Sequence, residues 1–378
     1  MTLIKNSLIL SLMCFVFSAH AAIPVPAAPK LSAKSFLLID INSDTVLAQK
    51  KIDRSIEPAS ITKMMTAYVV YKELEIGRIS LDEMVPISEK AWRMKGSKMF
   101  VEVGSKVRLG DLLMGLIVQS GNDASVALAE HIAGTEVIFA DYMNQYAKTL
   151  GMNKTNYVNS TGWPHHRHKT TARDIAVLAK ALITEFPEHY QLYSEKSMTY
   201  NGIKQYNRNK LLWRDKSIDG IKTGHTDSAG YCLVASAKRG DMRLISVILG
   251  TRSNKARTDQ SQKLLNYGFR FYESHALYVA GEGLKDVRIW EGEKENLALG
   301  LKQDLTVTIP RGQYKKLEAS MEIDQTIIAP VKKGQEMGSV HVKLNGDEII
   351  SMPLVALNTI EKGGLLQRAK DKIILMFD

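Results

Sequence analysis

The sequence has very little cysteine. Its 378 residues include only two, Cys14 and Cys232, and Cys14 lies in an N-terminal segment that we expect to be removed. Because Cys232 would then remain alone, an intramolecular disulfide is excluded, and the fold must depend on a packed core. Cys232 stands in an apolar run, which favours a small buried side chain over a reactive thiol.

Long hydrophobic runs are missing as well. After residue 21, no apolar stretch reaches the roughly 20 residues that a membrane-spanning helix needs. The first residues combine a positive Lys5, a short apolar run over 8–17 and the small-x-small sequence Ala19-His20-Ala21. This pattern is typical of a secretory signal peptide, so we predict one over residues 1–21 and export to the periplasm. An uncleaved anchor is the alternative, but the apolar run is short for a span.

The chain is basic, yet its positive charge is not concentrated. Lysine and arginine number 50 against 40 acidic residues, which gives a net charge of +10. The basic residues are scattered and form no basic arm, so we expect no nucleic-acid partner. For an exported protein, anionic lipid and acidic wall polymer are the more natural partners.

The length predicts about two domains, and the pattern of elements predicts an α+β fold for the first. Apolar strand patterns stand at both ends of this part and helical patterns between them, so we expect an antiparallel sheet flanked by helices over residues 22–281. The expected strands are 35–40, 45–48, 218–223, 231–237 and 244–249, and the expected helices are 60–72, 109–133 with a break at 120–122, 171–184 and 255–272.

The composition changes near Gly281. Beyond it the apolar runs are short and alternating, and Asn345-Gly346 is typical of a tight hairpin. We therefore predict a small β-sandwich-like domain over residues 282–358. We predict a membrane-associating amphipathic helix over residues 359–378, because the segment after Gly363-Gly364 can place apolar side chains on one helical face and basic side chains away from it. The alternative is a helix packed on the protein's own core.

The first chemical motif is Ser60-Ile61-Thr62-Lys63. At this spacing Ser60 and Lys63 share one face of a helix, and Ser60 lies at the helix N-terminus, where negative charge is favoured. The residues after Lys63 are apolar nearly all round, so the helix should be buried. Burial lowers the pKa of a lysine, and a neutral lysine beside a serine can take its proton. The motif alone is weak, because a capping serine and an exposed lysine occur often at this spacing.

Two further motifs follow in order. Ser120-Gly121-Asn122 interrupts an apolar helical stretch, and Ser120 can pass a proton to a leaving amine while Asn122 holds an amide. Lys222-Thr223-Gly224 lies on a strand and offers a cation and a hydroxyl for a carboxylate, with Gly224 allowing close approach. The backbone N–H of His225 can form an oxyanion hole with that of Ser60. Taken singly, each motif has a structural alternative. Ser120-Gly121-Asn122 can be a simple helix break, and Lys222-Thr223-Gly224 can be a surface lysine before a turn.

The ordered set of three motifs is much more specific. It resembles the signature of penicillin-binding proteins and serine β-lactamases. The surrounding sequences Pro58-Ala59-Ser60-Ile61-Thr62-Lys63-Met64-Met65-Thr66 and Gly220-Ile221-Lys222-Thr223-Gly224-His225-Thr226 closely resemble the low-molecular-mass D-Ala-D-Ala carboxypeptidases of the penicillin-binding protein 5 type, peptidase family S11. The resemblance runs from about Ser32 to the C-terminus and implies a serine β-lactamase/DD-peptidase-like fold.

The resemblance also implies roles and partners. Ser60 would attack the carbonyl between the last two D-alanines of a peptidoglycan stem peptide, and Lys63 would activate it. Ser120 would pass a proton to the departing D-alanine. The remaining site residues would bind the substrate: Asn122, Lys222, Thr223, Gly224 and His225. β-Lactams would acylate Ser60, no metal or other cofactor would be needed, and the enzyme would sit on the outer face of the inner membrane.

Rival functions remain open at this point. A β-lactamase is disfavoured, because the segment from Gly151 to Arg173 contains no aspartate or glutamate that could serve as a deacylating base. Endopeptidase action on cross-links and a non-catalytic penicillin-binding or wall-binding role are the alternatives. The loop His165-His166-Arg167-His168 has three histidines that could bind a metal, but an exposed flexible loop is the expected reading.

Overall fold

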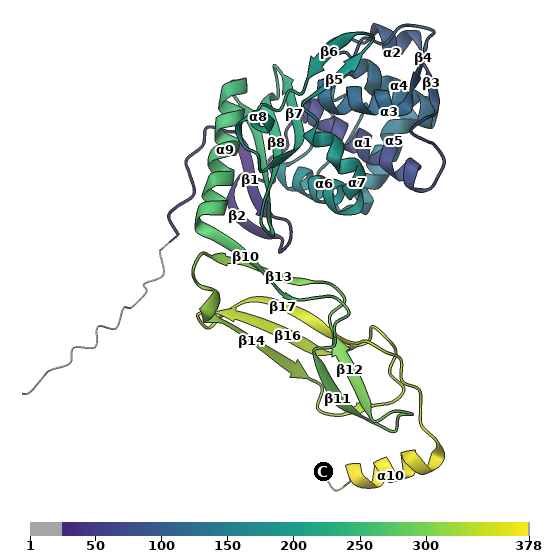
Figure 1. Ribbon diagram of the computed structural model, residues 1–378, viewed down its shortest axis with the longest axis vertical. Coiled ribbons are helices and arrows are strands. Elements are labelled where there is room, and N and C mark those ends of the chain that lie inside the picture. The colour runs from purple at the N-terminus through teal and green to yellow at the C-terminus, as the bar shows by residue number, and fades with distance from the viewer. Residues whose placement is uncertain (1–24, 377–378) are drawn as a thin grey trace, which may run out of the picture.

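The computed structural model describes residues 25–376, and the predicted signal peptide lies outside them. A larger domain of helices and sheet stands at one end of the molecule, a smaller β domain follows along the long axis, and the helix α10 (Leu365–Leu375) lies at the far end (Figure 1). Both the α+β class and the separate β domain expected from the sequence are confirmed.

A five-stranded antiparallel sheet is the centre of the larger domain, with β7 at one edge. Side chains of β1 alternate between its two faces: Leu37 belongs to one hydrophobic core, and Phe36 and Leu38 belong to the other. Both faces are therefore covered, which explains why these strands read as continuous apolar runs. In spatial order the strands are β2 (Thr45–Lys50), β1 (Ser35–Asp40), β9 (Met242–Thr251), β8 (Gly230–Arg239) and β7 (Ile218–Thr226).

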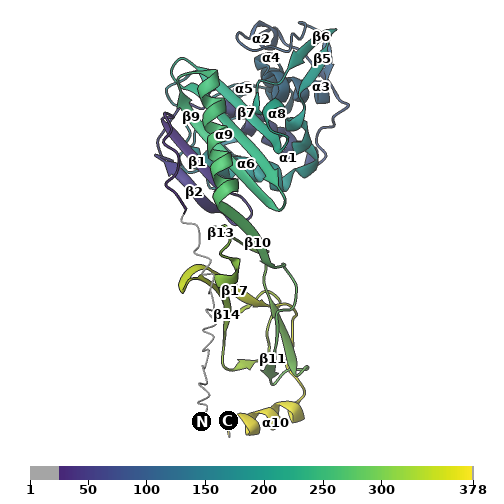
Figure 2. The same cartoon turned by 60° about the vertical axis from the view of Figure 1, so that its left-hand side comes forward.

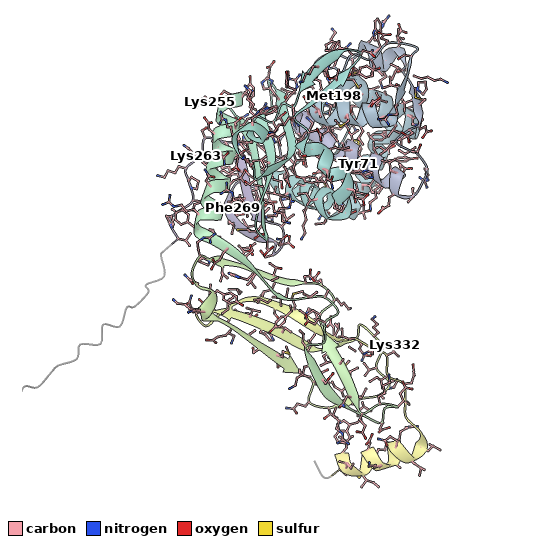
Figure 3. The ribbon with its side chains drawn as sticks, viewed as in Figure 1. Tyr71, Met198, Lys255, Lys263, Phe269 and Lys332 are labelled. Atoms are coloured by element: carbon pink, nitrogen blue, oxygen red, sulfur yellow. The ribbon has the colours of Figure 1, made fainter. Side chains whose placement is uncertain are left out.

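One long helix covers one face of the sheet. It is α9 (Asn254–Phe271), and its labelled residues Lys255, Lys263 and Phe269 follow one another down the sheet towards the β domain (Figure 3). Figure 2 shows the same helix lying across the strands.

The other face carries the helical half of the domain. Its central helix α1 (Lys63–Glu75) contacts α4, α5 and α6 and is buried along most of its length. The other helices here are α2 (Glu89–Arg93), α3 (Leu109–Met114), α4 (Asn122–Ala133), α5 (Glu136–Thr149), α6 (Ala172–Glu185) and α7 (Pro187–Tyr190), with α8 (Leu211–Arg214) near β7 and two small hairpins, β3 (Met84–Pro86) with β4 (Lys106–Arg108) and β5 (Ser197–Tyr200) with β6 (Ile203–Tyr206).

Two predicted helices differ in detail from the structure. The expected helix over 60–72 begins as a 3₁₀ turn, Ala59–Thr62, and becomes α-helical only at Lys63. The expected helix over 109–133 passes through a π-helical turn, Gly115–Gln119, before the break at Ser120. Such irregular turns often mark functional sites in helices.

The β domain consists of a six-stranded sheet and a two-stranded ribbon around one core. In the ribbon, β10 (Tyr272–Tyr278) pairs with β13 (Leu305–Pro310), so the chain enters this domain directly after α9. This pairing favours an earlier transition than the boundary at 281 that the composition predicts. The other strands are β11 (Lys285–Trp290), β12 (Asn296–Gly300), β14 (Leu317–Ile323), β15 (Ile327–Ile328), β16 (Glu336–Leu344) and β17 (Asp347–Ala356).

A buried carboxylate joins the two domains. Asp40, at the end of β1, is fully buried and accepts hydrogen bonds from the hydroxyls of Ser274 and Thr308 on the ribbon β10–β13, the second at 2.8 Å. Because a buried carboxylate is costly without donors, these bonds favour one relative placement of the two domains.

The helix α10 contacts the β domain through polar groups. Asp371 is buried, and its carboxylate accepts from the backbone N–H of Glu291 at 2.7 Å. The large apolar side chains of the helix point elsewhere: Leu365 is 82% exposed and Leu366 is 89% exposed. The helix is therefore not packed on the protein's own core by its apolar side chains. Among residues 25–376, no helix is both long and apolar enough to cross a membrane.

Candidate active site

A cleft of about 830 Å³ opens between the edge strand β7 and the helical half of the larger domain. It gathers residues from all three sequence motifs, which are far apart in the chain. Its wall includes Ser60, Gly96, Ser97, Ser120, Asn122, Thr161, Gly162, Trp163, Arg208, Thr223, Gly224, His225 and Arg257.

Lys63 lies at the base of this cleft and has three close partners. Its side chain is 1% exposed. The Nζ atom is 3.2 Å from Ser60 Oγ, and it donates to Asn122 Oδ1 at 2.7 Å and to the Thr161 carbonyl at 2.8 Å. The structure therefore brings the predicted base and the predicted nucleophile into hydrogen-bonding distance, and Asn122 holds the base.

Burial lowers the pKa of Lys63 to about 7, because the ammonium is removed from water, and the nearby Asp123 only partly offsets this. A neutral lysine has two N–H groups and one lone pair. Asn122 Oδ1 and the Thr161 carbonyl can only accept, so they take the two N–H groups. The lone pair then faces the Ser60 hydroxyl, which is the arrangement that a general base requires.

Two glycines, Gly162 and Gly224, let other segments of the chain approach the turn that carries Ser60 closely. A Cβ atom added to Gly162 would lie 1.8 Å from the carbonyl oxygen of Ala59, and one added to Gly224 would lie 3.0 Å from that of Pro58. Ala59 itself has a φ of 50°, a conformation that costs free energy and is often found beside functional residues. The sequence reading assigned Gly224 to substrate approach, whereas its missing Cβ faces the Ser60 turn.

Ser120 has an unusual backbone conformation. Its φ is 64°, in the left-handed region, and it directly follows the π-helical turn. Ser120 lines the cleft, but its hydroxyl is buried and has no hydrogen-bond partner among the described residues. Since buried hydroxyls are normally paired, a buried hydroxyl without a partner beside a cleft is unusual.

The Lys-Thr-Gly motif is split between the cleft and its interior. Thr223, Gly224 and His225 line the cleft, but Lys222 is buried and donates to the carbonyl of Thr223 at 3.2 Å. Burial lowers the pKa of Lys222 well below its ordinary value, and the charge of Lys63 adds to this effect. The role of Lys222 as a partner of a substrate carboxylate stays a prediction.

Two arginines that the sequence reading missed line the same wall. Arg257 comes from α9 and donates to the carbonyls of Gly224 at 2.9 Å and Cys232 at 3.2 Å. Arg208 donates to the carbonyl of Gln119, beside Ser120. Neither guanidinium has an acidic partner within 4.0 Å among residues 25–376. Nothing in the local sequence around either arginine marks it, because only the fold brings both to the cleft.

The histidine loop is not uniformly exposed, which corrects the expectation for His168. This residue is 1% exposed, and its Nδ1 accepts from the backbone N–H of Val158 at 3.2 Å. Nε2 therefore carries the proton and donates to the hydroxyl of Thr62, 2.9 Å away. Thr62 lies between Ser60 and Lys63 in the sequence. His168 thus helps to hold the turn Ala59–Thr62, which carries Ser60. In the part of the chain that the structure describes, no group of three or more histidine, cysteine or acidic side chains is placed to hold a metal.

Burial of His168 makes the stability of the protein depend on pH. Burial lowers the pKa of His168 from 6.5 to about 4. Between these two pH values His168 binds a proton in the unfolded chain but not in the folded chain, so the folded state loses stability as the pH falls. The free energy of unfolding should fall by about 3 kcal/mol as the pH drops through this window, from the usual value per pKa unit. Urea titrations at several pH values will measure it.

The matched variants for this experiment are His168→Gln and His166→Gln. Glutamine at 168 can still bond Thr62 but does not titrate, so this part of the pH dependence should disappear. His166 is exposed, and its replacement should leave the dependence unchanged. Equal pH dependence in the wild type and His168→Gln would contradict the prediction.

Comparison with known proteins agrees with this geometry. Residues 22–253 match the model of peptidase family S11, D-alanyl-D-alanine carboxypeptidase, and residues 272–362 match that of the penicillin-binding protein 5 C-terminal domain. The chain is 42% identical to the D-alanyl-D-alanine carboxypeptidase DacC of Escherichia coli, over 97% of this chain and 94% of that protein.

Solved structures give the same result. The structure of penicillin binding protein 5 from Haemophilus influenzae superposes with a TM-score of 0.86 at 41% identity, over 89% of this chain and all of that one. Penicillin-Binding Protein D2 from Listeria monocytogenes, in an ampicillin-bound form, superposes with a TM-score of 0.59 at 30% identity, over 63% of this chain and 98% of that one. The family match spans more than half of the sequence and includes all three motifs, and the chain therefore belongs to the D-alanyl-D-alanine carboxypeptidase family.

Proposed function

We propose that this protein removes the terminal D-alanine from peptidoglycan stem peptides through an acyl-enzyme on Ser60. The observation that carries the proposal is the 3.2 Å contact between Ser60 Oγ and the buried, low-pKa amine of Lys63. A serine is a weak nucleophile unless an adjacent base takes its proton, and this pair supplies that base. Family membership favours carboxypeptidase action over the endopeptidase and non-catalytic alternatives.

In the acylation step, Lys63 takes the proton of the Ser60 hydroxyl, and Ser60 Oγ attacks the carbonyl carbon between the two D-alanines. We assign stabilisation of the oxyanion to the backbone N–H groups of Ser60 and His225, and the packing of β7 on the Ser60 turn at Gly224 supports this assignment. The C–N bond then breaks, the departing D-alanine amine takes a proton, and an ester on Ser60 remains. Water hydrolyses this ester and restores the Ser60 hydroxyl.

Ser120 is the group that we assign to deliver the proton to the leaving amine. Its unpaired buried hydroxyl supports this role, since it can donate its proton to the amine and accept in return the proton that Lys63 took from Ser60, which leaves Lys63 neutral again. Asn122 serves mainly to hold Lys63, and its side-chain N–H donates to the Lys95 carbonyl at 2.6 Å.

The terminal carboxylate of the substrate is assigned to Thr223 together with Arg257 and Arg208. A guanidinium binds a carboxylate more strongly than a neutral donor does, and both arginines lack an acidic partner among the described residues. Lys222, buried behind Thr223, contributes from a distance by orienting the Thr223 carbonyl. β-Lactams, which carry a carboxylate beside a reactive amide, should acylate Ser60 in the same cleft.

We further propose that the mature protein works in the periplasm, attached to the inner membrane by α10. The helix lies at the end of the molecule opposite the catalytic domain, and its exposed Leu365, Leu366 and Ile373 can enter the interface of an anionic bilayer. The β domain would then hold the cleft away from the membrane, towards the cell wall.

The first test of the function is release of D-alanine. The purified chain should release D-alanine from an N-acylated tripeptide ending in D-Ala-D-Ala, and Ser60→Ala should release none, because it lacks the nucleophile. Folding of the variant is checked by its circular dichroism and thermal unfolding. A folded wild type that binds penicillin covalently but releases no D-alanine would argue against the carboxypeptidase assignment.

The pH dependence of acylation tests Lys63. The base must be neutral, so the acylation rate constant with a fluorescent penicillin should fall about ten-fold per pH unit below about 7. Stopped-flow measurement over this range gives the profile. Lys63→Arg keeps the charge but cannot be neutral at these pH values, and it should acylate at least about a thousand-fold more slowly. A flat profile down to pH 5 would refute the role of Lys63 as base.

Membrane attachment is tested with two variants of equal length. Leu366→Glu/Ile373→Glu puts charge on the exposed apolar side chains and should abolish sedimentation with anionic vesicles. Lys370→Gln removes one exposed basic residue of the same helix and should weaken binding to the vesicles about five-fold, or roughly 1 kcal/mol, without abolishing it. Deletion from Gly363 onward should also release the protein, and a truncated chain that still sediments would rule out α10 as the anchor.

A further inference from the structure

One mostly buried carboxylate near the active site has been given no role so far. It belongs to Glu136, the first residue of α5, and its side chain is only 13% exposed. The helix α5 packs against α1, which begins at Lys63. Glu136 therefore reaches the surroundings of the base from a helix that carries none of the three sequence motifs.

Glu136 holds Ser160 by two hydrogen bonds. Its Oε1 atom accepts from the backbone N–H of Ser160 at 3.1 Å and from the Ser160 hydroxyl at 2.9 Å. Ser160 is fully buried, and its carbonyl accepts from the hydroxyls of Thr66 on α1, at 2.6 Å, and Ser125 on α4, at 2.8 Å. Ser160 is thus fixed to three helices at once, and α5 acts on it through Glu136.

The residue after Ser160 provides one of the acceptors of the base. The carbonyl of Thr161 accepts from Lys63 Nζ at 2.8 Å, and the N–H of the same peptide unit, that of Gly162, donates to Asn159 Oδ1 at 2.8 Å. Since the C=O and N–H of a trans peptide point in opposite directions, a bond on the N–H side helps to direct the carbonyl towards the amine. The direction of this carbonyl therefore depends on how firmly Ser160, just before it, is held.

The charge of Glu136 also acts on the amine of Lys63. Burial is the main cause of the low pKa of Lys63, and the negative charges of Asp123 and Glu136 oppose it. Asp123 is fully buried and accepts from backbone N–H groups of residues 99–101, so it is committed to holding that loop. Glu136 is the carboxylate whose charge can be removed while an oxygen remains to accept from Ser160.

One cation partly compensates Glu136. Its Oε2 atom lies 2.9 Å from the Nζ atom of Lys90 on α2, whose side chain is 51% exposed. The field of Glu136 at Lys63 therefore depends on Lys90 as well. The other charged or titratable groups that face Glu136 or Lys63 are Arg93, Lys95, His168, Arg208 and Lys222.

We propose that Glu136 is a positioning residue for the reaction, which holds the Thr161 carbonyl on the Lys63 amine through Ser160 and whose charge, balanced by Lys90, favours the protonated form of that amine. The inference rests on the proposed function, because it concerns the base of that reaction. Removal of the charge and removal of the contact should then have different effects.

The pH dependence of acylation by a fluorescent penicillin tests the effect of the charge. Glu136→Gln keeps an acceptor for Ser160 but removes the charge, so the midpoint of the acid limb should move to lower pH, by about half a unit. Lys90→Met removes the balancing cation and should move the midpoint to higher pH, by less, because Lys90 is half exposed. A loss of structure alone would not shift the midpoint in opposite directions in the two variants.

The matched control removes a carboxylate from the same helix. Asp141 also lies on α5, but it is exposed, so Asp141→Asn should leave the midpoint at the wild-type value.

The positioning effect is tested with Glu136→Ala. This variant loses the contact to Ser160 as well as the charge, so the acylation rate constant on the plateau above the acid limb should fall about ten-fold. Glu136→Gln should keep the wild-type plateau. The dissociation constant of the penicillin before acylation should stay the same in all variants, because Glu136 does not line the cleft. Thermal unfolding checks that each variant is folded.

The outcomes separate the two proposals. Equal midpoints in the wild type, Glu136→Gln and Lys90→Met, or a wild-type plateau in Glu136→Ala, would overturn the inference while Lys63 remains the base. A flat pH profile in the wild type would count against Lys63 as the base of the proposed function, and against the inference with it.

Discussion

The active site depends on the burial of one amine. Lys63 is nearly inaccessible, and removing an ammonium from water is costly unless it is neutralised or paired. No carboxylate pairs with Lys63 within 4.0 Å among the described residues; Asn122 and the Thr161 carbonyl supply neutral acceptors instead. The fold thus lowers the pKa of Lys63 while keeping its side chain in place, which is what the proposed role as base for Ser60 requires.

Three separate segments must meet for this to occur. The Ser60 turn, the break before α4 and the loop Thr161–His168 each give a contact to Lys63 or to its turn, and glycines at 162 and 224 let the backbones approach. The left-handed conformations of Ala59 and Ser120 cost free energy locally and are sustained by the packing around them. A change in any of these segments is therefore expected to disturb the chemistry more than the overall fold.

The larger domain and the helix α10 lie at opposite ends of the molecule, with the β domain between them. The cleft lies in the larger domain, α10 lies beyond the β domain, and the bonds of Asp40 to Ser274 and Thr308 join the domains. At α10, the buried Asp371 holds the helix by a polar contact and leaves Leu365 and Leu366 exposed. The exposed apolar side chains of α10 and the cleft therefore belong to opposite ends of the molecule.

The sequence alone determined the fold class, the elements of the sheet and the order of the three motifs, because these depend on local periodicity and on residues close together in the chain. It also indicated a buried Lys63, since the residues after it are apolar on every side. Only the tertiary structure decided that Arg208 and Arg257 share the cleft, that Lys222 lies behind it, that Gly224 faces the Ser60 turn and that His168 is buried. Those facts depend on packing between segments far apart in sequence, and local patterns carry no record of such distances.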